Sequence, residues 1–356
     1  MFKDTLLSIL ERHELYISRC IQLALQGTYA AMPNPSVGAV VVHNGRIIGE
    51  GFTSPYGGPH AEPNAIASVK NQELLKESTL YVSLEPCSHF GKTPPCCDLV
   101  IEKQIPKVVI GTVDPFAKVC GRGIQKMRDA GVEVIVEVLE KECQESNKRF
   151  FTFHNKKRPY IILKWAESQD GFIAPITRDT HRPFWISNTY SKQLVHKWRS
   201  EEMAFLVGTQ TVLSDNPSLT TRDWYGDSPI RVFLDRSGKI DHTFSIKAET
   251  VKTICITADQ SLVSTENLVY EYADFTDNLL QQIIDILYKH NIMSVVIEGG
   301  TQTLQSFIDA KLWDEARIFT GETILGNGIA APVLTEFDNA VKHRILDNEL
   351  RIVYPK

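Results

Sequence analysis

The segment that most constrains the fold runs from residue 60 to residue 97. It opens with His60-Ala61-Glu62 and closes with Glu85-Pro86-Cys87, a loop, and the adjacent pair Cys96 and Cys97. One imidazole and two thiols are the donors of a tetrahedral zinc site. Three protein ligands would leave the fourth position open for water, as catalytic zinc sites do. We therefore predict that His60, Cys87 and one cysteine of the adjacent pair meet in space and bind one Zn2+ per chain.

Glu62 follows His60 by two residues, which places a carboxylate close to the predicted metal. Zinc lowers the pKa of a bound water, and a neighbouring carboxylate can carry the proton. His-x-Glu followed by Pro-Cys is the signature of zinc nucleobase deaminases. We therefore predict that Glu62 is catalytic. A zinc-stabilised binding module is the non-catalytic alternative, but Glu62 and the presence of only three obvious ligands argue against it.

The spacing of the two thiols narrows the class of deaminase. Eight residues separate Cys87 from Cys96, where the usual signature has two. With HAE at 60–62, the string LEPCSHFGKTPPC at 84–96 resembles the deaminase half of the bifunctional riboflavin-biosynthesis deaminase–reductase family. That resemblance implies a cytidine-deaminase-like α/β/α fold of three layers. Its TPPC pattern selects Cys96 as the ligand and leaves Cys97 as a small buried residue.

The same resemblance implies several contacts with the pyrimidine substrate. Asn34, within Pro33-Asn34-Pro35, becomes a candidate for binding the base edge, although a simple turn is the alternative. Asp114 is a second candidate contact. His89 and Lys92, inside the loop between the thiols, are expected to face the substrate or its phosphate. His89 as a fourth zinc ligand is the less favoured alternative.

Length and composition bound the class of protein. A chain of 356 residues is expected to form two domains. With 43% hydrophobic and 23% charged residues and a net charge of −5, it has the composition of a soluble globular protein. We expect no nucleic-acid partner and no membrane span. Seven cysteines without a signal peptide favour a reducing, cytoplasmic setting. We also expect a homo-oligomer.

Hydrophobic patterning predicts a mixed sheet between helices in the first half. A helix is expected over 5–27, a hairpin of strands 37–42 and 46–50 around Asn44-Gly45, and further strands at 79–84, 107–111 and 132–138. The charge-rich stretch 139–158 ends in Lys156-Lys157-Arg158 before Pro159, and this basic triplet is interpreted as a solvated linker rather than a nucleic-acid patch. We therefore place a deaminase domain at 1–157 and a reductase domain at 158–356.

Strands and helices also alternate after Pro159, which predicts a second α/β domain. At Ile297-Glu298-Gly299-Gly300-Thr301 a strand ends in two glycines and a helix begins, an arrangement suited to phosphate. The strings KWA, WIS, VGTQTVLSDNPSLTTR and EGGT resemble the dihydrofolate-reductase-like reductase half of the same family. Two departures from the family pattern, SQDG at 168–171 and HRPF at 181–184, leave the contacts around 168–184 open.

The resemblance implies a set of reductase residues. NADPH would lie along Ala166, Trp185, Thr211, Asp215, Gly300, Thr301, Gln302, Thr303, Leu304, Gln305 and Ser306. The substrate would contact Arg199, Leu219, Arg222 and Glu298. Two arginines could clamp a phosphate through charge-assisted hydrogen bonds, although a surface ion pair is the default role of either one alone.

We therefore predict a bifunctional enzyme that acts on a phosphorylated pyrimidine. The first half would remove an exocyclic amine by zinc-dependent hydrolysis. The second would reduce the ribosyl side chain with NADPH, the protein mainly positioning cofactor and substrate. The alternatives are a cytidine- or tRNA-adenosine-type deaminase fused to an unrelated domain, and a chain in which one half is inactive.

Overall fold

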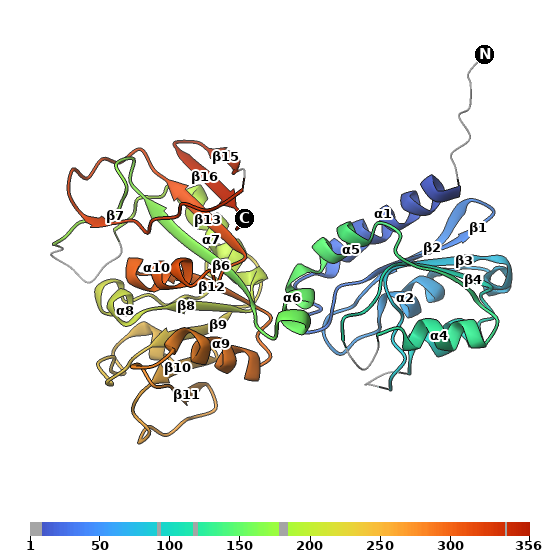
Figure 1. The fold of residues 1–356 in the computed structure, drawn as a ribbon, viewed down its shortest axis with the longest axis horizontal. Coiled ribbons are helices and arrows are strands. Elements are labelled where there is room, and N and C mark those ends of the chain that lie inside the picture. The colour runs from blue at the N-terminus through green and yellow to red at the C-terminus, as the bar shows by residue number, and fades with distance from the viewer. Residues whose placement is uncertain (1–8, 91–93, 117–119, 178–183, 339) are drawn as a thin grey trace, which may run out of the picture. The chain divides into compact units, whose positions relative to one another are not determined.

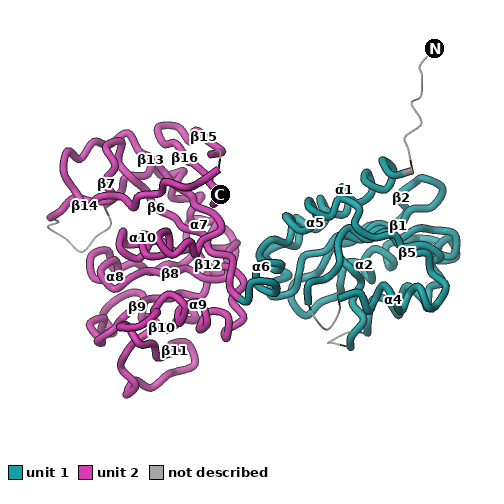
Figure 2. The backbone as a smooth tube through the Cα atoms, viewed as in Figure 1, with its two compact units in different colours: residues 1–157 teal, residues 158–356 magenta. Residues whose placement is uncertain are grey.

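The structure of the protein is a computed structural model that describes residues 9–90, 94–116, 120–177, 184–338 and 340–356. The chain separates into two compact units, Met1–Lys157 and Arg158–Lys356 (Figure 2). None of the helices within these described ranges is both long enough and apolar enough to cross a membrane.

The first unit is built on a five-stranded sheet with the order β2-β1-β3-β4-β5. Strand β1 is antiparallel to both of its neighbours, whereas β3, β4 and β5 run parallel to one another. The strands are β1 (Gly38–His43), β2 (Arg46–Phe52), β3 (Thr79–Leu84), β4 (Lys107–Thr112) and β5 (Glu133–Ile135).

The β1–β2 hairpin turns at Asn44 and Gly45, as predicted. Both residues have positive φ, 48° and 74°, which is the backbone of a type I′ turn. The Tyr16 hydroxyl donates to the Gly45 carbonyl at 2.9 Å and so ties the turn to the first helix. The turn fixes the register and sends Val40 and Val42 to one face of the sheet.

Helices cover both faces of this sheet (Figure 1). Helices α1 (Ile9–Gly27) and α5 (Glu140–Ser146) pack together on one face. Helix α2 (Ala61–Ser68) packs on β1 and β2 and contacts α3 (Cys96–Glu102), which in turn contacts α4 (Arg122–Asp129). A short 3-10 helix spans Gln72–Glu77. The three-layer α/β/α class expected for this half is confirmed.

Two stretches differ from the sequence prediction. The strand expected over 132–138 is shorter, because β5 ends at Ile135. The charge-rich stretch before the domain boundary, for which no element was predicted, carries α5 and α6 (Lys148–Lys156), and α6 includes Lys156 of the triplet expected to be a linker. Phe150 and Phe153 of α6 are each only 6% exposed, so α6 is an amphipathic helix although its sequence is rich in charged residues.

The second unit contains a nine-stranded sheet with the order β11-β10-β9-β8-β12-β6-β13-β16-β15. The first seven run parallel, and β16 and β15 extend the edge in antiparallel fashion. Its strands are β6 (Tyr160–Glu167), β8 (Ala204–Val207), β9 (Ile230–Leu234), β10 (Thr253–Thr257), β11 (Leu268–Tyr272), β12 (Ser294–Gly299), β13 (Glu315–Thr320), β15 (Val341–Ile345) and β16 (Asn348–Val353).

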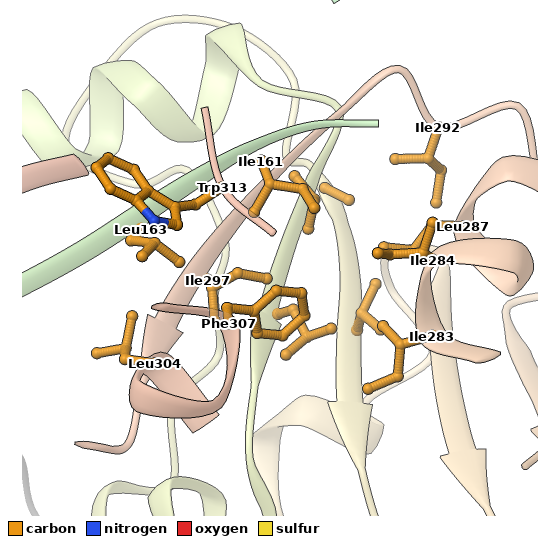
Figure 3. Close-up of a cluster of buried hydrophobic side chains, with 14 of the residues drawn as sticks. Ile161, Leu163, Ile283, Ile284, Leu287, Ile292, Ile297, Leu304, Phe307 and Trp313 are labelled. Carbon is orange, nitrogen blue, oxygen red and sulfur yellow. The ribbon is translucent and has the colours of Figure 1, made fainter. Parts of the chain in front are cut away.

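Helices cover both faces of the large sheet as well. They are α7 (Thr189–Glu201), α8 (Thr209–Asp215), α9 (Leu279–Lys289) and α10 (Thr301–Asp309), with a 3-10 turn at Ser245–Lys247 and a small ladder of β7 (Phe172–Ala174) and β14 (Ile329–Ala330). Side chains of α9 and α10 pack on β6 and β12 in one core (Figure 3). Residues of α7 and α8 pack in a second core. The α/β class expected for this half is confirmed.

Candidate active sites

His60, Cys87 and Cys96 come together in the first unit. Among the described residues they form one group whose ligand atoms all lie within 4.8 Å of one another. His60 Nδ1 is 3.6 Å from Cys87 Sγ and 3.4 Å from Cys96 Sγ. Two thiols and one imidazole nitrogen at this separation match the donor set of a zinc site with one open position. The residues present therefore fit zinc.

The local fold explains why these three residues meet. His60 is the N-cap residue of α2, and Cys87 lies three residues beyond the end of β3. Cys96 begins α3, where its backbone N–H points at Cys87 Sγ, 3.3 Å away. The N–H of Cys97 donates to the Cys87 carbonyl at 3.2 Å. Because Cys87 Sγ accepts the Cys96 N–H at the start of α3, the contact favours the thiolate form of Cys87.

The electrostatics of the cluster favour one thiolate even without a cation. The hydrogen bond with the Cys96 thiol, with a further contribution from His60, lowers the pKa of Cys87 to about 4. The same pairing and burial raise the pKa of Cys96, while the contact with Cys87 raises the pKa of His60. Metal ligands must be deprotonated, so a bound cation would favour the second thiolate as well.

Glu62 is buried in the first turn of α2, with only 3% of its surface exposed. Burial, together with the Cys87 charge, raises the pKa of Glu62 to about 7. Its carboxyl group also contacts the Cys96 thiol. A buried carboxyl group that touches a metal ligand and faces no arginine or lysine in these contacts is suited to exchanging protons.

A second buried carboxylate, Glu85, organises the wall beside the cluster. Its oxygens accept backbone N–H groups from Gly121 at 2.9 Å, Gly123 at 3.0 Å and Ile124 at 3.3 Å. Glu85 therefore supplies acceptors for the free N–H groups at the N-terminus of α4. It also holds that helix against the end of β3, just before Cys87. A Cβ at Gly123 would lie 2.3 Å from the Pro86 carbonyl, so only glycine permits this approach.

The other residues predicted around this site differ in their burial and in their contacts. Cys97 is fully buried and points to Asp98, with its Sγ 3.5 Å from Oδ1. His89 is exposed and meets the edge of Phe116, and it lies outside the cluster formed by the described ligands. Asp114 is buried, and burial raises its pKa to about 7. Asn34 is half-buried in the turn before β1, whereas Lys92 lies outside the described residues.

The second unit holds a cavity of about 1750 Å³ at the carboxyl ends of its central parallel strands. All eleven residues expected along NADPH line it, as do Arg199, Arg222 and Glu298. Leu219 differs, because its side chain is 1% exposed and packs in the core with α7. The carboxyl edge of a parallel sheet is where such folds bind nucleotides.

Two strand-to-helix turns meet at the floor of this cavity. The Gly208 N–H before α8 donates to the Gly299 carbonyl before α10 at 2.9 Å. A Cβ on Gly208 would lie 2.6 Å from Thr303 Oγ1, and Gly299 has φ of 128°. A side chain at Gly208 would therefore displace the Thr303 hydroxyl, and the positive φ of Gly299 favours glycine. Together the turns present helix N-termini to the cavity, which suits an anionic ligand.

A charged triad lies on the wall formed by β6 and β12. Glu298 is 3.7 Å from Lys164 Nζ and 3.2 Å from an Arg199 nitrogen, and all three side chains are largely buried. Burial raises the pKa of Glu298, but Arg199 and Lys164 outweigh it and leave that pKa lowered. Arg199 Nε is buried without a partner among the described residues. Two cations against one anion leave an excess positive charge facing the cavity.

Lys164, His196, Arg236 and Lys239 also line this cavity, and the sequence analysis did not single them out. One signal was available for Lys164, a charged residue interrupting the apolar strand YIILKW. Arg236 and Lys239 follow the end of β9, where ligand-binding residues of parallel sheets gather. His196 carried no sequence signal, because its role depends on a contact with a distant loop.

Comparison with known proteins finds a different family match in each half of the chain. Residues 10–112 match the cytidine and deoxycytidylate deaminase zinc-binding region, and residues 159–351 match the RibD C-terminal domain. The riboflavin biosynthesis protein RibD of Aquifex aeolicus is 37% identical over 88% of this chain and 88% of its own length. That of Chlamydia pneumoniae is 34% identical over 97% of this chain and 96% of its own.

Solved structures align with nearly the whole chain. A Thermotoga maritima deaminase/reductase aligns with a TM-score of 0.85 and 38% identity, covering 98% of this chain and 100% of its own. Acinetobacter baumannii RibD aligns with a TM-score of 0.86 and 28% identity, covering 98% and 99%. Fold and site together define a zinc-dependent deaminase joined to a reductase. The chain belongs to the RibD family of bifunctional riboflavin-biosynthesis enzymes.

Proposed function

We propose that the first unit deaminates the diaminohydroxyphosphoribosylaminopyrimidine named for the Thermotoga maritima relative, and that the second unit reduces the resulting 5-amino-6-(5-phosphoribosylamino)uracil with NADPH. The observation that carries the proposal is the buried Glu62 beside the group of His60, Cys87 and Cys96. The order of the reactions follows from the two substrates, since the second is the first with one exocyclic amine replaced by oxygen.

In the deaminase half, His60, Cys87 and Cys96 would hold zinc, whose chemistry is to make water a nucleophile near neutral pH. Glu62 would take a proton at its carboxylate and deliver it to the departing amine nitrogen. Glu85 would keep α4 and Asp114 in place beside the pyrimidine. Asn34 would contact the base edge.

Replacement of Glu62 tests this assignment. We expect Glu62→Gln to lower the rate of ammonia release by roughly 10²- to 10⁴-fold, because the amide cannot transfer the proton. Zinc content and NADPH oxidation with the uracil substrate should stay at the wild-type level. Glu73→Gln, at an exposed residue paired with Lys76, is the matched control. Ammonia release at the wild-type rate in Glu62→Gln would refute the role of Glu62.

In the reductase half, NADPH would supply the hydride, and the residues of the chain would bind and orient the cofactor and the substrate. The turns before α8 and α10, with Ala166, Trp185, Asp215 and residues 301–306, would hold the cofactor. Arg199, Arg222, Glu298 and Lys164 would hold the substrate. Lys164 and Arg199 give that wall the positive charge that a phosphorylated sugar requires.

The preference for NADPH over NADH is part of the proposal, and Arg236 and Lys239 support it. Both are exposed cations that line the same cavity as the proposed cofactor residues. We expect the double variant Arg236→Ser, Lys239→Ser to raise the KM for NADPH by about tenfold or more. The variant loses two charge-assisted hydrogen bonds to the phosphate that NADH lacks, and such bonds are stronger than neutral ones. The KM for NADH should not change. Equal effects on both cofactors would contradict this preference.

The homo-oligomeric state and cytoplasmic location remain predictions. Seven free cysteines, three of them within or next to the proposed zinc site, suit a reducing compartment. Light scattering coupled to size-exclusion chromatography of the full chain measures the oligomeric state. A mass of one chain would contradict the predicted homo-oligomer.

A further inference from the structure

We propose that His196 is a positioning residue of the reductase half, which holds the backbone at Arg222 so that this arginine faces the substrate phosphate. The inference rests on the proposed function of the second unit and names a residue that sets its substrate affinity. His196 lies on α7, whereas Arg222 lies in the segment between α8 and β9. Both line the cavity.

The geometry fixes the imidazole at both nitrogens. The backbone N–H of Arg222 donates to His196 Nδ1 at 3.1 Å. On the other side of the ring, Nε2 is 3.4 Å from Asp223 Oδ2. Because Nδ1 accepts, the proton of the neutral ring is on Nε2, where it faces the carboxylate. His196 is 5% exposed, so its ring is shielded from water, whereas the Asp223 side chain is 65% exposed.

The charge around the ring supports this tautomer. The groups that act on His196 are Arg199 of its own helix, Arg222 and Asp223 of the facing segment, and Glu298 of β12. Burial, followed by the charges of the two arginines, lowers the pKa of His196 despite the two carboxylates. The ring is therefore neutral near pH 7, and the Nδ1 lone pair is available to Arg222.

The Arg222 guanidinium is held by its own segment, so its position depends on how that segment is anchored. It is solvent-exposed, and within the described part of the chain its guanidinium contacts the Ser218 and Thr220 hydroxyls of its own segment. A neighbouring fixed point of the segment is the Thr221 N–H, which donates to Ser228 Oγ at 3.0 Å. His196 thus joins the Arg222 backbone to α7, and Arg199 of the same helix donates to the Thr220 carbonyl at 3.3 Å. The two arginines then form a phosphate clamp of fixed width.

Substitution of His196 by asparagine or by glutamine distinguishes the contact of Nδ1 from the contact of Nε2. An asparagine at this position would place its Oδ1 near the position of Nδ1 and could still accept the Arg222 N–H. A glutamine would instead place its amide near the position of Nε2 and leave that N–H unpaired. The experiment therefore compares His196→Asn and His196→Gln in the full zinc-loaded chain. The assay follows NADPH oxidation with 5-amino-6-(5-phosphoribosylamino)uracil. His290→Gln, at a histidine of the same unit paired with Glu271, is the control.

We expect His196→Gln to raise the KM for the uracil substrate by about tenfold with a much smaller change in kcat, because a buried N–H loses its acceptor. His196→Asn should recover most of that loss. The KM for NADPH, the ammonia release and the melting temperature should match those of His290→Gln. Equal KM values for the Asn and Gln variants, at either the wild-type or a raised level, would overturn the proposal. Wild-type enzyme that fails to oxidise NADPH would instead refute the reductase function.

Discussion

The side-chain amide of Asn147 pairs with both backbone polar groups of Ser36, 111 residues earlier in the chain. Oδ1 accepts the Ser36 N–H at 2.9 Å, and Nδ2 donates to the Ser36 carbonyl at 2.8 Å. Asn147 is 7% exposed and lies between α5 and α6. It therefore anchors the turn that carries Asn34 to the junction of these two helices, in the way a neighbouring strand would.

Asn147→Ala tests this anchor. It should destabilise the first unit by about 2 to 4 kcal/mol, since two buried backbone groups lose their partners. It should also lower kcat/KM for ammonia release, because the turn with Asn34 is released. Thermal unfolding and the ammonia assay measure the two effects. Asn155→Ala, at an exposed residue of α6, is the control. Identical behaviour of the two variants would contradict the anchor.

The adjacent thiols Cys96 and Cys97 offer a matched pair for the metal site. Cys96→Ala should lose zinc and with it ammonia release, because one of three ligands is removed. Cys97→Ala should keep about one zinc per chain and cost about 1 kcal/mol of stability, as a buried packing residue does. Zinc analysis and thermal unfolding check both outcomes. Loss of zinc from Cys97→Ala alone would show that the wrong thiol was chosen.

Removal of the metal should affect the two halves differently. Prolonged chelation should abolish ammonia release and lower the unfolding temperature of the first unit, since zinc binding stabilises the fold that forms the site. NADPH oxidation with the uracil substrate should persist, because the cavity of the second unit is lined by none of the three ligands. Readdition of Zn2+ should restore ammonia release. Full deaminase activity in zinc-free protein would contradict the metal assignment.

The loss of stability of the first unit at acidic pH should depend in part on His13. This ring is 8% exposed, with Nδ1 2.9 Å from the Tyr81 hydroxyl, and burial and then Lys107 lower its pKa. Because the pKa of His13 is lower in the folded state, the unfolded state takes up a proton first on acidification. The stability that the neutral ring contributes is therefore complete above the ordinary histidine pKa of about 6.5 and is lost as the pH falls through the folded-state pKa. His13→Asn should therefore lose less stability than wild type on acidification. Unfolding curves at several pH values measure this difference, and parallel losses would contradict it.

Much of the deaminase site was predictable because its chemistry is local in sequence. The HAE and PC motifs fix residue types, and the NG turn fixes a hairpin whose register places the following strands. What sequence could not supply were partners brought together by the fold. Asn147 and Ser36 carry no pattern that links them, and Glu85 shows its role only when the N–H groups of α4 are seen around it.

The reductase site was predicted less completely for the same reason. The expected cofactor residues follow strand ends, where an α/β fold gathers its ligands, and they do line the cavity. Leu219 was expected at the substrate, but its side chain belongs to a core that periodicity alone does not reveal. The helices within 140–156 were not predicted, because charged residues there outnumber the buried Cys143 of α5 and the buried Phe150 and Phe153 of α6.

The most direct test of the account follows ammonia release and NADPH oxidation separately in purified, zinc-loaded full-length protein. The substrate is the diaminohydroxyphosphoribosylaminopyrimidine, supplied first without and then with NADPH. We predict ammonia in both cases and NADPH oxidation only after ammonia has been released. No ammonia from fully metallated protein would contradict the function assigned to His60, Glu62, Cys87 and Cys96.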